Sequence, residues 1–600
     1  PGGVWIIESW STLRSGISFG LFLDSTSKSA IGYLPMLLAL ALVFRFQPRY
    51  FLVVWVSMVL TVLSTMGSIW IMHLFGMYQT AYSHPPEVVS AIFEISFGVQ
   101  LIEVVKKKRF TQPDPMGRWR EALEEMRSSI NRVTGAAVFG FALYGFWFQN
   151  LSRALEMDIL YLFGAFIARA IALHFLPALY LFAVRNGERD IELWRWVKKL
   201  CDGTEYAINR TARFFMSIAF ALSKVKDLRR VAYAVLALLA LVVGIAWVEG
   251  RFDFIARPLE YMPQDSNHIR AALRANEGAG SDGIKFLFGN PMKKDCLKDE
   301  GCFQKLVAFQ GDVEKLHGVR GSFSIALEVL YQIGERPRDS FEDIVTDVLA
   351  GEFQTNPRLR QYLNPESSGM VLVFAQHPMD NSEGTGAAYD AGLLLSHRFA
   401  EGNSGYEAFS LGDQPFYVEM ARMLPEQFPW FVLSTIASIA LFAALFMRSK
   451  GSGWYVPAWR IGFALASPFV FGTCVVAIIM LVFGIGLEIA TSAIVPTVLA
   501  CASDACFYPA IHFLKLLDEG MHPDDAMWRA FGEKGGPVVV DGGTNSFGLL
   551  PLAVSMFSPV AYLGILAIIA INACVSWSLA TTLPIMEAGV KPKEDIYATE

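Results

Sequence analysis

Eleven long apolar segments constrain the fold of this chain more than any other feature. A helix that crosses the hydrocarbon core of a bilayer needs about 20 mostly apolar residues, and the chain as a whole is 53% hydrophobic. The segments therefore predict a mostly α-helical protein that crosses a membrane about eleven times. They cover residues 30–46, 51–74, 87–105, 134–149, 156–183, 231–248, 429–447, 461–484, 490–513, 544–560 and 562–586.

Basic residues near the segment ends predict the orientation. Lys106, Lys107 and Lys108 follow the third segment, and further arginines and lysines follow the first, fifth and seventh segments. All of these ends fall on one side if the segments alternate in direction, and loops rich in Lys and Arg stay in the cytoplasm. Residues 250–427 then lie outside. The net charge of only −6 gives no indication of a nucleic-acid partner.

The outer stretch 250–427 contains no spanning segment and is expected to fold as a mixed α/β domain. Apolar runs at 284–288 and 369–375 are typical of strands. Between them, apolar residues recur at helical spacing over 306–316, and a second helix is predicted over 389–400.

Two of the seven cysteines, Cys296 and Cys302, lie in this outer domain. Five residues separate them on the oxidising side of the membrane, which favours a short-loop disulfide. No metal site is expected there, because no histidine or second cysteine pair is close in sequence. The chain also has no phosphate loop, metal-ligand cluster or nucleophile motif, so we expect neither an enzyme nor a bound cofactor.

An internal repeat relates residues 76–97 to residues 486–507 without gaps. Duplicated halves are common in transporters, so such a repeat is informative about function. In each copy a carboxylate follows a proline by eight residues inside an apolar span. A constant offset of 410 residues pairs Gly76 with Gly486, Pro86 with Pro496, Glu94 with Asp504, Phe97 with Phe507 and Thr134 with Thr544.

The paired carboxylates Glu94 and Asp504 are the candidates for function. Eight residues of helix rise about 12 Å, which places both acids near the middle of the bilayer. A charge there costs roughly 2.5–3.5 kcal/mol on insertion scales, so such a group should face the protein interior and can bind and release a proton. The alternative is that each acid stays neutral and only forms a hydrogen bond to a neighbouring helix.

Candidate partners in the relay come from the adjacent spans. Arg169 either pairs with Glu94 or extends to the cytoplasmic face, and Asp541 is expected at the membrane boundary. The remaining candidates are the titratable His512 and the polar residues that begin the tenth segment, Thr544, Asn545 and Ser546.

Several short motifs resemble the RND superfamily of exporters, and specifically its MMPL-type branch of predicted hydrophobe or lipid exporters. Tyr261-Met-Pro-Gln-Asp-Ser-Asn resembles the entry to the second porter domain of that family. Ser558-Pro559 with Leu563-Gly564 resembles its link between the last two spans, and Leu176-Pro177 and Leu583-Pro584 close the final span of each half. Asp504 matches the family's acid in the fourth span, although Ala505 follows it and no glycine run precedes it.

The resemblance implies two parallel transmembrane repeats and one periplasmic α/β porter-type domain, without the family's first span and first periplasmic domain. The expected parts are the end of a preceding periplasmic segment (1–29), a first bundle of five spans (30–183), an elbow in the cytoplasm or at the membrane surface (184–230), the first span of the second half (231–249), the porter-like domain (250–427), a second bundle of five spans (428–587) and a cytoplasmic tail (588–600).

The same resemblance implies a transporter of the bacterial inner membrane, driven by the proton gradient, that exports a hydrophobic or lipid-like small molecule. Protonation of Asp504 and Glu94 would change helix packing and so drive the periplasmic domain. The expected partners are the lipid bilayer, the substrate, and either further copies of the chain or periplasmic accessory proteins. The alternative is a scaffold or sensor that keeps the RND fold without transporting anything.

Overall fold

The computed structural model divides the chain into two compact units. Residues 23–253 and 425–600 belong to the membrane unit, and residues 1–22 and 254–424 belong to the α/β unit. The structure describes residues 33–45, 47–74, 85–109, 111–149, 152–184, 195–254, 282–289, 298–316, 319, 321–355, 370–377, 382–402, 407–411, 414–447, 454–555 and 558–592.

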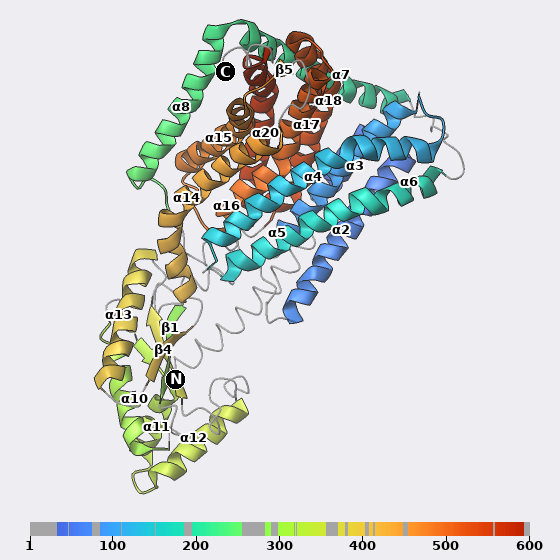
Figure 1. Cartoon of the computed structure of the whole chain (residues 1–600). Helices are drawn as coiled ribbons and strands as arrows, with labels where there is room; N and C mark the ends of the chain where they lie inside the picture. The colour runs from blue at the N-terminus through green and yellow to red at the C-terminus, as the bar shows by residue number, and fades with distance from the viewer. Residues whose placement is uncertain are drawn as a thin grey trace. The chain divides into compact units, whose positions relative to one another are not determined.

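The membrane unit is built of long helices packed side by side (Figure 1). The helix over Tyr33–Val43 comes first among the described residues. The long helix α14 (Gln414–Phe446) enters this unit from the α/β unit. The other helices are α2 (Pro48–Leu74), α3 (Pro85–Lys108), α4 (Pro115–Trp147), α5 (Ser152–Ala170), the π-helical turn η2 (Ile171–Phe175), α6 (Leu176–Val184), α7 (Arg195–Lys224), α8 (Lys226–Val248), α15 (Ala458–Phe483), α16 (Ile489–Ser492), α17 (Ile494–Asp518), α18 (Pro523–Gly548), α19 (Leu550–Ala553) and α20 (Ser558–Glu587).

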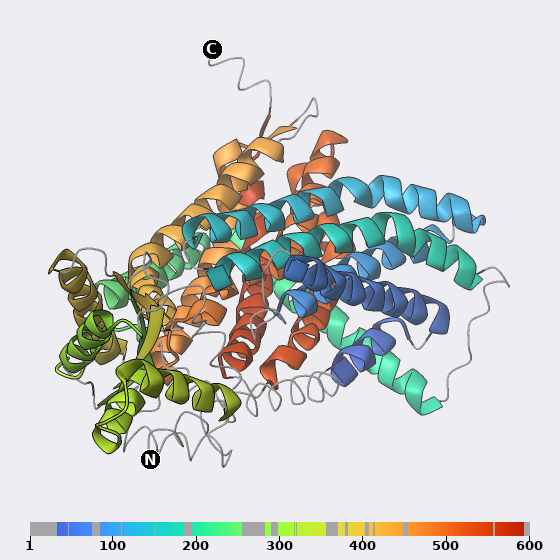
Figure 2. The same cartoon turned by 90° about the horizontal axis from the view of Figure 1, so that it is seen from below.

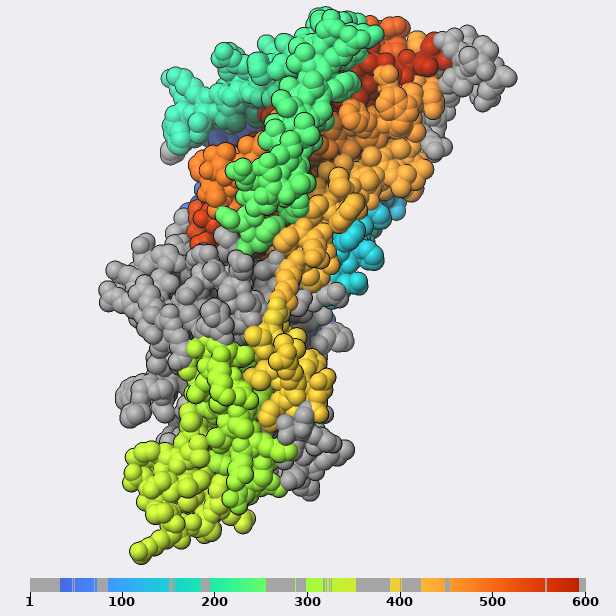
Figure 3. All heavy atoms as spheres, turned by 90° about the vertical axis from the view of Figure 1, so that its left-hand side faces the viewer, coloured from blue at the N-terminus to red at the C-terminus, as the bar shows by residue number. Residues whose placement is uncertain are grey.

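Eight of the described helices are long and apolar enough to cross a membrane, which makes the protein a multi-pass membrane protein. Many of the exposed side chains of these helices are apolar, as the buried ones are. Figure 3 shows α8 on the surface of the unit, where only 6% of its apolar window is buried and Leu238, Leu241 and Ile245 are exposed. An apolar surface of this extent is compatible with lipid rather than with water.

Three of the eleven predicted spans fall on helices that do not meet this standard of length and hydrophobicity, so the number eleven stays a prediction. They are the short helix Tyr33–Val43, helix α4 and helix α18. The predicted segment 544–560 is wrong as one continuous helix. Helix α18 begins at Pro523, ends at Gly548 and is followed by the short helix α19, and α20 begins at Ser558. Helix α18 contains polar and charged side chains, so hydropathy did not predict it as one continuous helix.

The helix ends repeat with the offset that the sequence motif shows. Helices α2 and α15 begin at Pro48 and Ala458, 410 residues apart. Helices α3 and α17 end at Lys108 and Asp518, again 410 residues apart. Insertions between the two copies are therefore absent from this part of the bundle, and Glu94 and Asp504 occupy equivalent positions in helices that run in the same direction.

Helix α7 corresponds to the predicted elbow and lies across one end of the bundle (Figure 1). It packs on α18 and α20, and Cys201, Ala219 and Leu222 are buried, while Trp196 and Phe214 are exposed. Lys224 at its end donates to Asp524 of α18 at 2.8 Å, and this hydrogen bond raises the pKa of Lys224. We call this end of the bundle the basic end, because α3 also finishes there with three lysines.

The α/β unit contains a four-stranded antiparallel sheet in the order β2-β3-β1-β4. Strands β1 (Asp282–Gly289) and β3 (Met370–His377) cover both predicted strands, and β2 (Gly321–Phe323) and β4 (Glu407–Leu411) complete the sheet. The predicted helices are also present, as α10 (Glu300–Val313) and α13 (Ser382–Gly402). Helices α11 (Ile325–Glu335) and α12 (Phe341–Thr355) share a core with α10 and Phe286 of β1.

Cys302, near the start of α10, is buried and takes part in a disulfide. Its predicted partner Cys296 lies outside the described residues, so the pairing stays a prediction. The five cysteines of the membrane unit are buried free thiols.

Candidate functional site

Helices α3, α17 and α18 pack against one another in the membrane unit, and two of the buried acidic side chains of the unit lie at their contact. The apolar windows of α3 and of α16–α17 are both 94% buried, so these helices are central rather than lipid-facing. Small residues allow the close approach, since Ala502, Ser503 and Ala505 of α17 are fully buried. Gly542 of α18 is equally constrained, because a Cβ there would lie 3.0 Å from Val575 of α20.

Two carboxyl groups meet at this contact. The Ser96 hydroxyl of α3 is hydrogen-bonded to Oδ2 of Asp504 on α17 and, at 2.6 Å, to Oδ1 of Asp541 on α18. The three side chains are between 0 and 2% exposed. We call Asp504 and Asp541 the carboxyl pair.

The number of protons available decides the state of the carboxyl pair. A serine hydroxyl has one proton, so Ser96 donates to one carboxyl and accepts from the other. A carboxyl donates only as the acid, and therefore at least one member of the carboxyl pair carries a proton in this arrangement. Among the described residues no basic side chain acts on Asp504 or Asp541, so nothing compensates two negative charges held this close.

The second oxygen of each carboxyl is free. Among the described residues, Oδ1 of Asp504 and Oδ2 of Asp541 have no hydrogen-bond partner. Buried polar atoms in proteins are almost always paired, with protein or with water. The carboxyl pair therefore has one bridged proton site and two buried oxygens without a partner among the described residues.

Glu94 lies on α3 two residues before Ser96, and consequently points away from the carboxyl pair. Successive residues of a helix are about 100° apart, so residues 94 and 96 occupy nearly opposite faces. Glu94 is fully buried and faces Ser57 and Thr61 of α2. The hydroxyls of Ser57 and Thr61 donate to backbone oxygens at 2.9 and 3.0 Å, and both carboxyl oxygens of Glu94 lack a partner among the described residues.

The polar residues at the end of α18 bind backbone atoms rather than Asp504. Thr544 donates to the backbone oxygens of Val540 and Asp541 at 3.1 and 3.0 Å, and Ser546 donates to that of Gly542 at 2.8 Å. Asn545 donates to the backbone oxygen of Cys501 at 2.8 Å. Asn545 thereby joins α18 to α17 next to the carboxyl pair, as a positioning residue.

His512 and Arg169 also lie away from the carboxyl pair. His512 is in contact with Glu533 of α18 at 2.8 Å, nearer the basic end. Arg169 donates to Asn131 of α4 at 2.7 Å in an exposed position, which agrees with extension toward the surface rather than with pairing to Glu94.

Sequence reasoning missed two residues of the site. Ser96 gave no signal, because a single serine in an apolar helix is common. Asp541 was expected at the membrane boundary, and the structure places its fully buried side chain beside Asp504, where both share the Ser96 hydroxyl. The signal for Asp541 was its position after Val538, Val539 and Val540, an apolar run that belongs to the interior of a helix beginning at Pro523.

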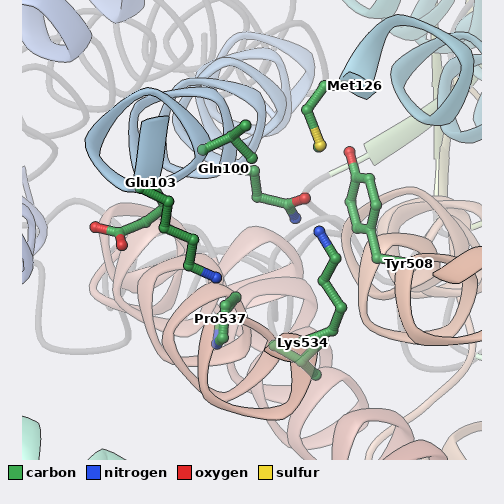
Figure 4. A pocket seen from close by; sticks show the side chains of 9 residues that line it. Gln100, Glu103, Met126, Tyr508, Lys534 and Pro537 are labelled. Carbon is green, nitrogen blue, oxygen red and sulfur yellow. The ribbon is translucent and has the colours of Figure 1, made fainter. Parts of the chain in front are cut away.

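A small cavity lies between the carboxyl pair and the basic end (Figure 4). Its volume of about 20 Å³ is enough for one water molecule. Tyr508, Gln100 and Lys534 point into it from α17, α3 and α18. Tyr508 is one helical turn beyond Asp504, and its buried hydroxyl has no hydrogen-bond partner among the described residues. The described residues contain no cluster of His, Cys, Asp and Glu that could hold a metal ion.

Comparison with known proteins supports the fold and leaves the family open. No protein-family model matches the sequence, and no curated protein matches it. Many solved structures are similar, and three of them match over nearly the whole chain. SecDF from Thermus thermophilus, a translocon-associated membrane protein, has a TM-score of 0.56 at 13% identity, with 96% of this chain and 63% of that chain covered.

SecDF in a super-membrane-facing form has a TM-score of 0.53 at 13% identity, with the same coverage. The hedgehog release protein Disp from the water bear Hypsibius dujardini has a TM-score of 0.56 at 10% identity, with 95% of this chain and 70% of that chain covered. The chain thus spans less than two thirds of the length of the SecDF structures. From its helices and from these neighbours, the chain is a multi-pass membrane protein whose fold is similar to the folds of SecDF and Disp.

Proposed function

We propose that this protein is a secondary active transporter in which the carboxyl pair couples proton movement to the export of a hydrophobic or lipid-like small molecule. The observation that carries the proposal is the sharing of the Ser96 hydroxyl by Asp504 and Asp541 in a fully buried contact. Such a contact is stable only while it holds at least one proton. Intramembrane acids that face a bundle interior commonly mark proton pathways.

The proposed cycle changes the number of protons on the carboxyl pair. With one proton or two, Ser96 joins α3 to both α17 and α18. When the last proton leaves, two carboxylates face one donor in a medium of low dielectric, and their repulsion drives α18 away from α17. Rebinding of a proton restores the contact. The packing of three helices then depends on the proton count, as a coupled transporter requires.

The cavity beside Tyr508 supplies the route toward the basic end, which we propose to be the cytoplasmic side of a bacterial inner membrane. Lysines 106, 107 and 108 at that end support this orientation. A water molecule in the cavity would connect the Tyr508 hydroxyl with Gln100 and Lys534. Protons released by Asp504 would leave by this route, down the gradient.

Movement in the bundle would reach the α/β unit through the chain itself. Helix α8 precedes that unit in the sequence, and α14 continues from it into the membrane unit without interruption between Gln414 and Phe446. The α/β unit would open and close around substrate on the periplasmic side. The hydrophobic substrate class comes from the resemblance to MMPL-type exporters. Of the proteins with a similar fold, SecDF is a translocon-associated membrane protein and Disp is a hedgehog release protein.

The test uses the purified full chain in vesicles that contain a fluorescent phospholipid, with an imposed proton gradient. The proposal predicts gradient-dependent movement of the probe that a protonophore abolishes and that Asp504→Asn and Asp541→Asn remove. The exposed Asp227→Asn is the matched control and should behave as wild type. Probe movement that is equal in all variants would show that the carboxyl pair does not couple transport. If folded wild-type protein moves no probe and its carboxyls do not respond to the gradient, the scaffold alternative is favoured.

A further inference from the structure

A further buried acid, Asp158, lies at the opposite end of the bundle from the basic end. Asp158 is in the second turn of α5, is only 3% exposed, and its Oδ1 has no hydrogen-bond partner among the described residues. It belongs neither to the repeat motif nor to the carboxyl pair. An unpartnered carboxyl buried to this degree is unfavourable unless it has a function or a hidden partner.

Gly145 on α4 leaves the space that the Asp158 carboxyl occupies. A Cβ at Gly145 would lie 2.2 Å from Oδ2 of Asp158, so only glycine leaves room for the carboxyl between α4 and α5. Figures 1 and 2 both show these two helices side by side along their length. The titratable groups that interact with Asp158 among the described residues are Tyr144 and Tyr161, and no basic group does so.

The two tyrosines differ in what their hydroxyls do. Tyr144 is in hydrogen-bond contact with Ser492 at 3.0 Å and donates to the backbone oxygen of Ile489 at 3.3 Å, which anchors α4 to α16. Tyr161 faces Thr497 of α17, and neither of these two buried hydroxyls has a hydrogen-bond partner among the described residues. Stacking on Phe141, with ring centroids 4.4 Å apart, holds the Tyr161 ring in place. The hydroxyls of Tyr161 and Thr497 can therefore take part in proton transfer. The hydroxyl of Tyr144 already forms hydrogen bonds to α16.

Thr497 lies on the same helix as Asp504, between Tyr161 and the carboxyl pair. It precedes Asp504 by seven residues, about 10 Å of helix. Cys501 lies one turn from each, and it interacts both with Tyr161 on one side and with Asp504 and Asp541 on the other. A buried file of polar side chains thus runs from Asp158 through Tyr161 and Thr497 toward the carboxyl pair, and a short chain of water molecules must bridge the interval between Thr497 and Asp504.

We propose that Asp158 is a second proton-binding residue, which receives protons at the end of the bundle opposite the basic end and passes them through Tyr161 and Thr497 toward Asp504. A proton from water binds the Asp158 carboxylate and makes it neutral. Tyr161 then accepts that proton at its hydroxyl oxygen while its own proton moves to Thr497. Thr497 releases its own proton to the adjacent water, and the chain of waters delivers a proton to the Asp504 carboxylate. Asp158 ends ionised and Asp504 neutral, so charge and protons balance. The inference rests on the proposed function.

The experiment measures proton uptake by proteoliposomes of the full chain after an acid step, with a pH-sensitive dye. Asp158→Asn is expected to slow uptake roughly tenfold or more, as loss of a positioned proton acceptor does, and Asp158→Glu should restore part of it. Tyr161→Phe should also slow uptake. Tyr144→Phe is the matched control, because it removes a buried tyrosine hydroxyl from the same contact without interrupting the file, and it should leave uptake unchanged.

The outcomes separate this inference from the proposed function. If Asp504→Asn stops proton uptake while Asp158→Asn and Tyr161→Phe do not, the file is wrong and the carboxyl pair still functions. If Asp504→Asn has no effect, the proposed function fails, and a pH titration followed by infrared spectroscopy decides on Asp158 alone. A carboxylic-acid band that disappears in Asp158→Asn would support proton binding there, and a spectrum unchanged by that substitution would overturn it. If Asp158→Asn does not fold, Asp158→Glu and Tyr161→Phe decide between the same results.

Discussion

Asp504 of α17 and Asp541 of α18 are held together by a single hydroxyl, that of Ser96 on α3. Three helices therefore meet at a contact whose stability depends on how many protons it contains. The same contact explains why α18 can keep an aspartate in the centre of an apolar bundle, since a neutral acid hydrogen-bonded to a neighbour is tolerated where a lone carboxylate is not.

Ser96→Ala removes the shared hydroxyl and leaves both acids buried. We expect a loss of about 1 kcal/mol of stability, the usual range for hydrogen bonds between membrane helices, together with a changed pH profile of proton uptake. Ser503→Ala is the matched control, because Ser503 is equally buried but donates only within its own helix, to Ala500 at 3.1 Å. Thermal unfolding in detergent and uptake at several pH values check both effects. Equal behaviour of the two variants would contradict the bridging role of Ser96.

Asp504→Asn and Asp541→Asn should not be additive. Each single change leaves one titratable group, so the loss of proton uptake in the double variant should be close to that in either single variant. Groups that act as one unit show such coupling in a double-mutant cycle. Independent, additive losses would mean that the two carboxyls act separately.

The contact between α19 and α20 depends on Gly564. A Cβ at this position would lie 2.4 Å from the backbone nitrogen of Ala553, which cannot move aside, so Gly564→Ala should destabilise the protein by roughly 1–3 kcal/mol. Gly536→Ala in α18 is the control, because nothing lies within 4 Å of its Cβ position and alanine favours helix. Unfolding midpoints measured side by side should fall for the first variant and stay level or rise for the second.

The ion pair between Lys224 and Asp524 should contribute to stability in a pH-dependent way. The hydrogen bond to Asp524 raises the pKa of Lys224 in the folded protein, so the contribution is complete below the pKa of an unfolded-state lysine and disappears as pH rises through the raised value. Both side chains are substantially exposed, so the effect is small. Lys224→Gln should lower the unfolding midpoint slightly at neutral pH and not at strongly alkaline pH. A difference that grows with pH would have the wrong sign.

Much of the fold could be predicted from the sequence, because long apolar helices and alternating strands leave a direct pattern in it. The repeat offset of 410 residues placed Glu94 and Asp504 at equivalent positions, and the helix ends agree with it. The start of helix α18 was not predicted, because charged residues interrupt any apolar run in its first half. They are Asp524, Asp525, Glu533 and Lys534.

The site itself was only half predictable. Asp504 was identifiable as an acid in an apolar span, but its partners Ser96 and Asp541 depend on which faces of three helices meet, and that is a property of packing. Glu94, its counterpart in the repeat, occupies the same helical position and yet faces α2, so equal position did not mean equal surroundings. Asp158 was visible in the sequence near the start of the fifth span, but the glycine that makes room for it lies on another helix.

The most direct test of the central claim is an infrared difference spectrum of the purified protein, taken across a pH titration in wild type and in the Asp504→Asn/Asp541→Asn double variant. The structure predicts a buried carboxylic-acid band in the wild type that changes with pH and is missing from the double variant. A wild-type spectrum in which both carboxyls are ionised at neutral pH, and in which the double variant alters no acid band at any pH, would contradict the claim that Asp504 and Asp541 bind and release a shared proton.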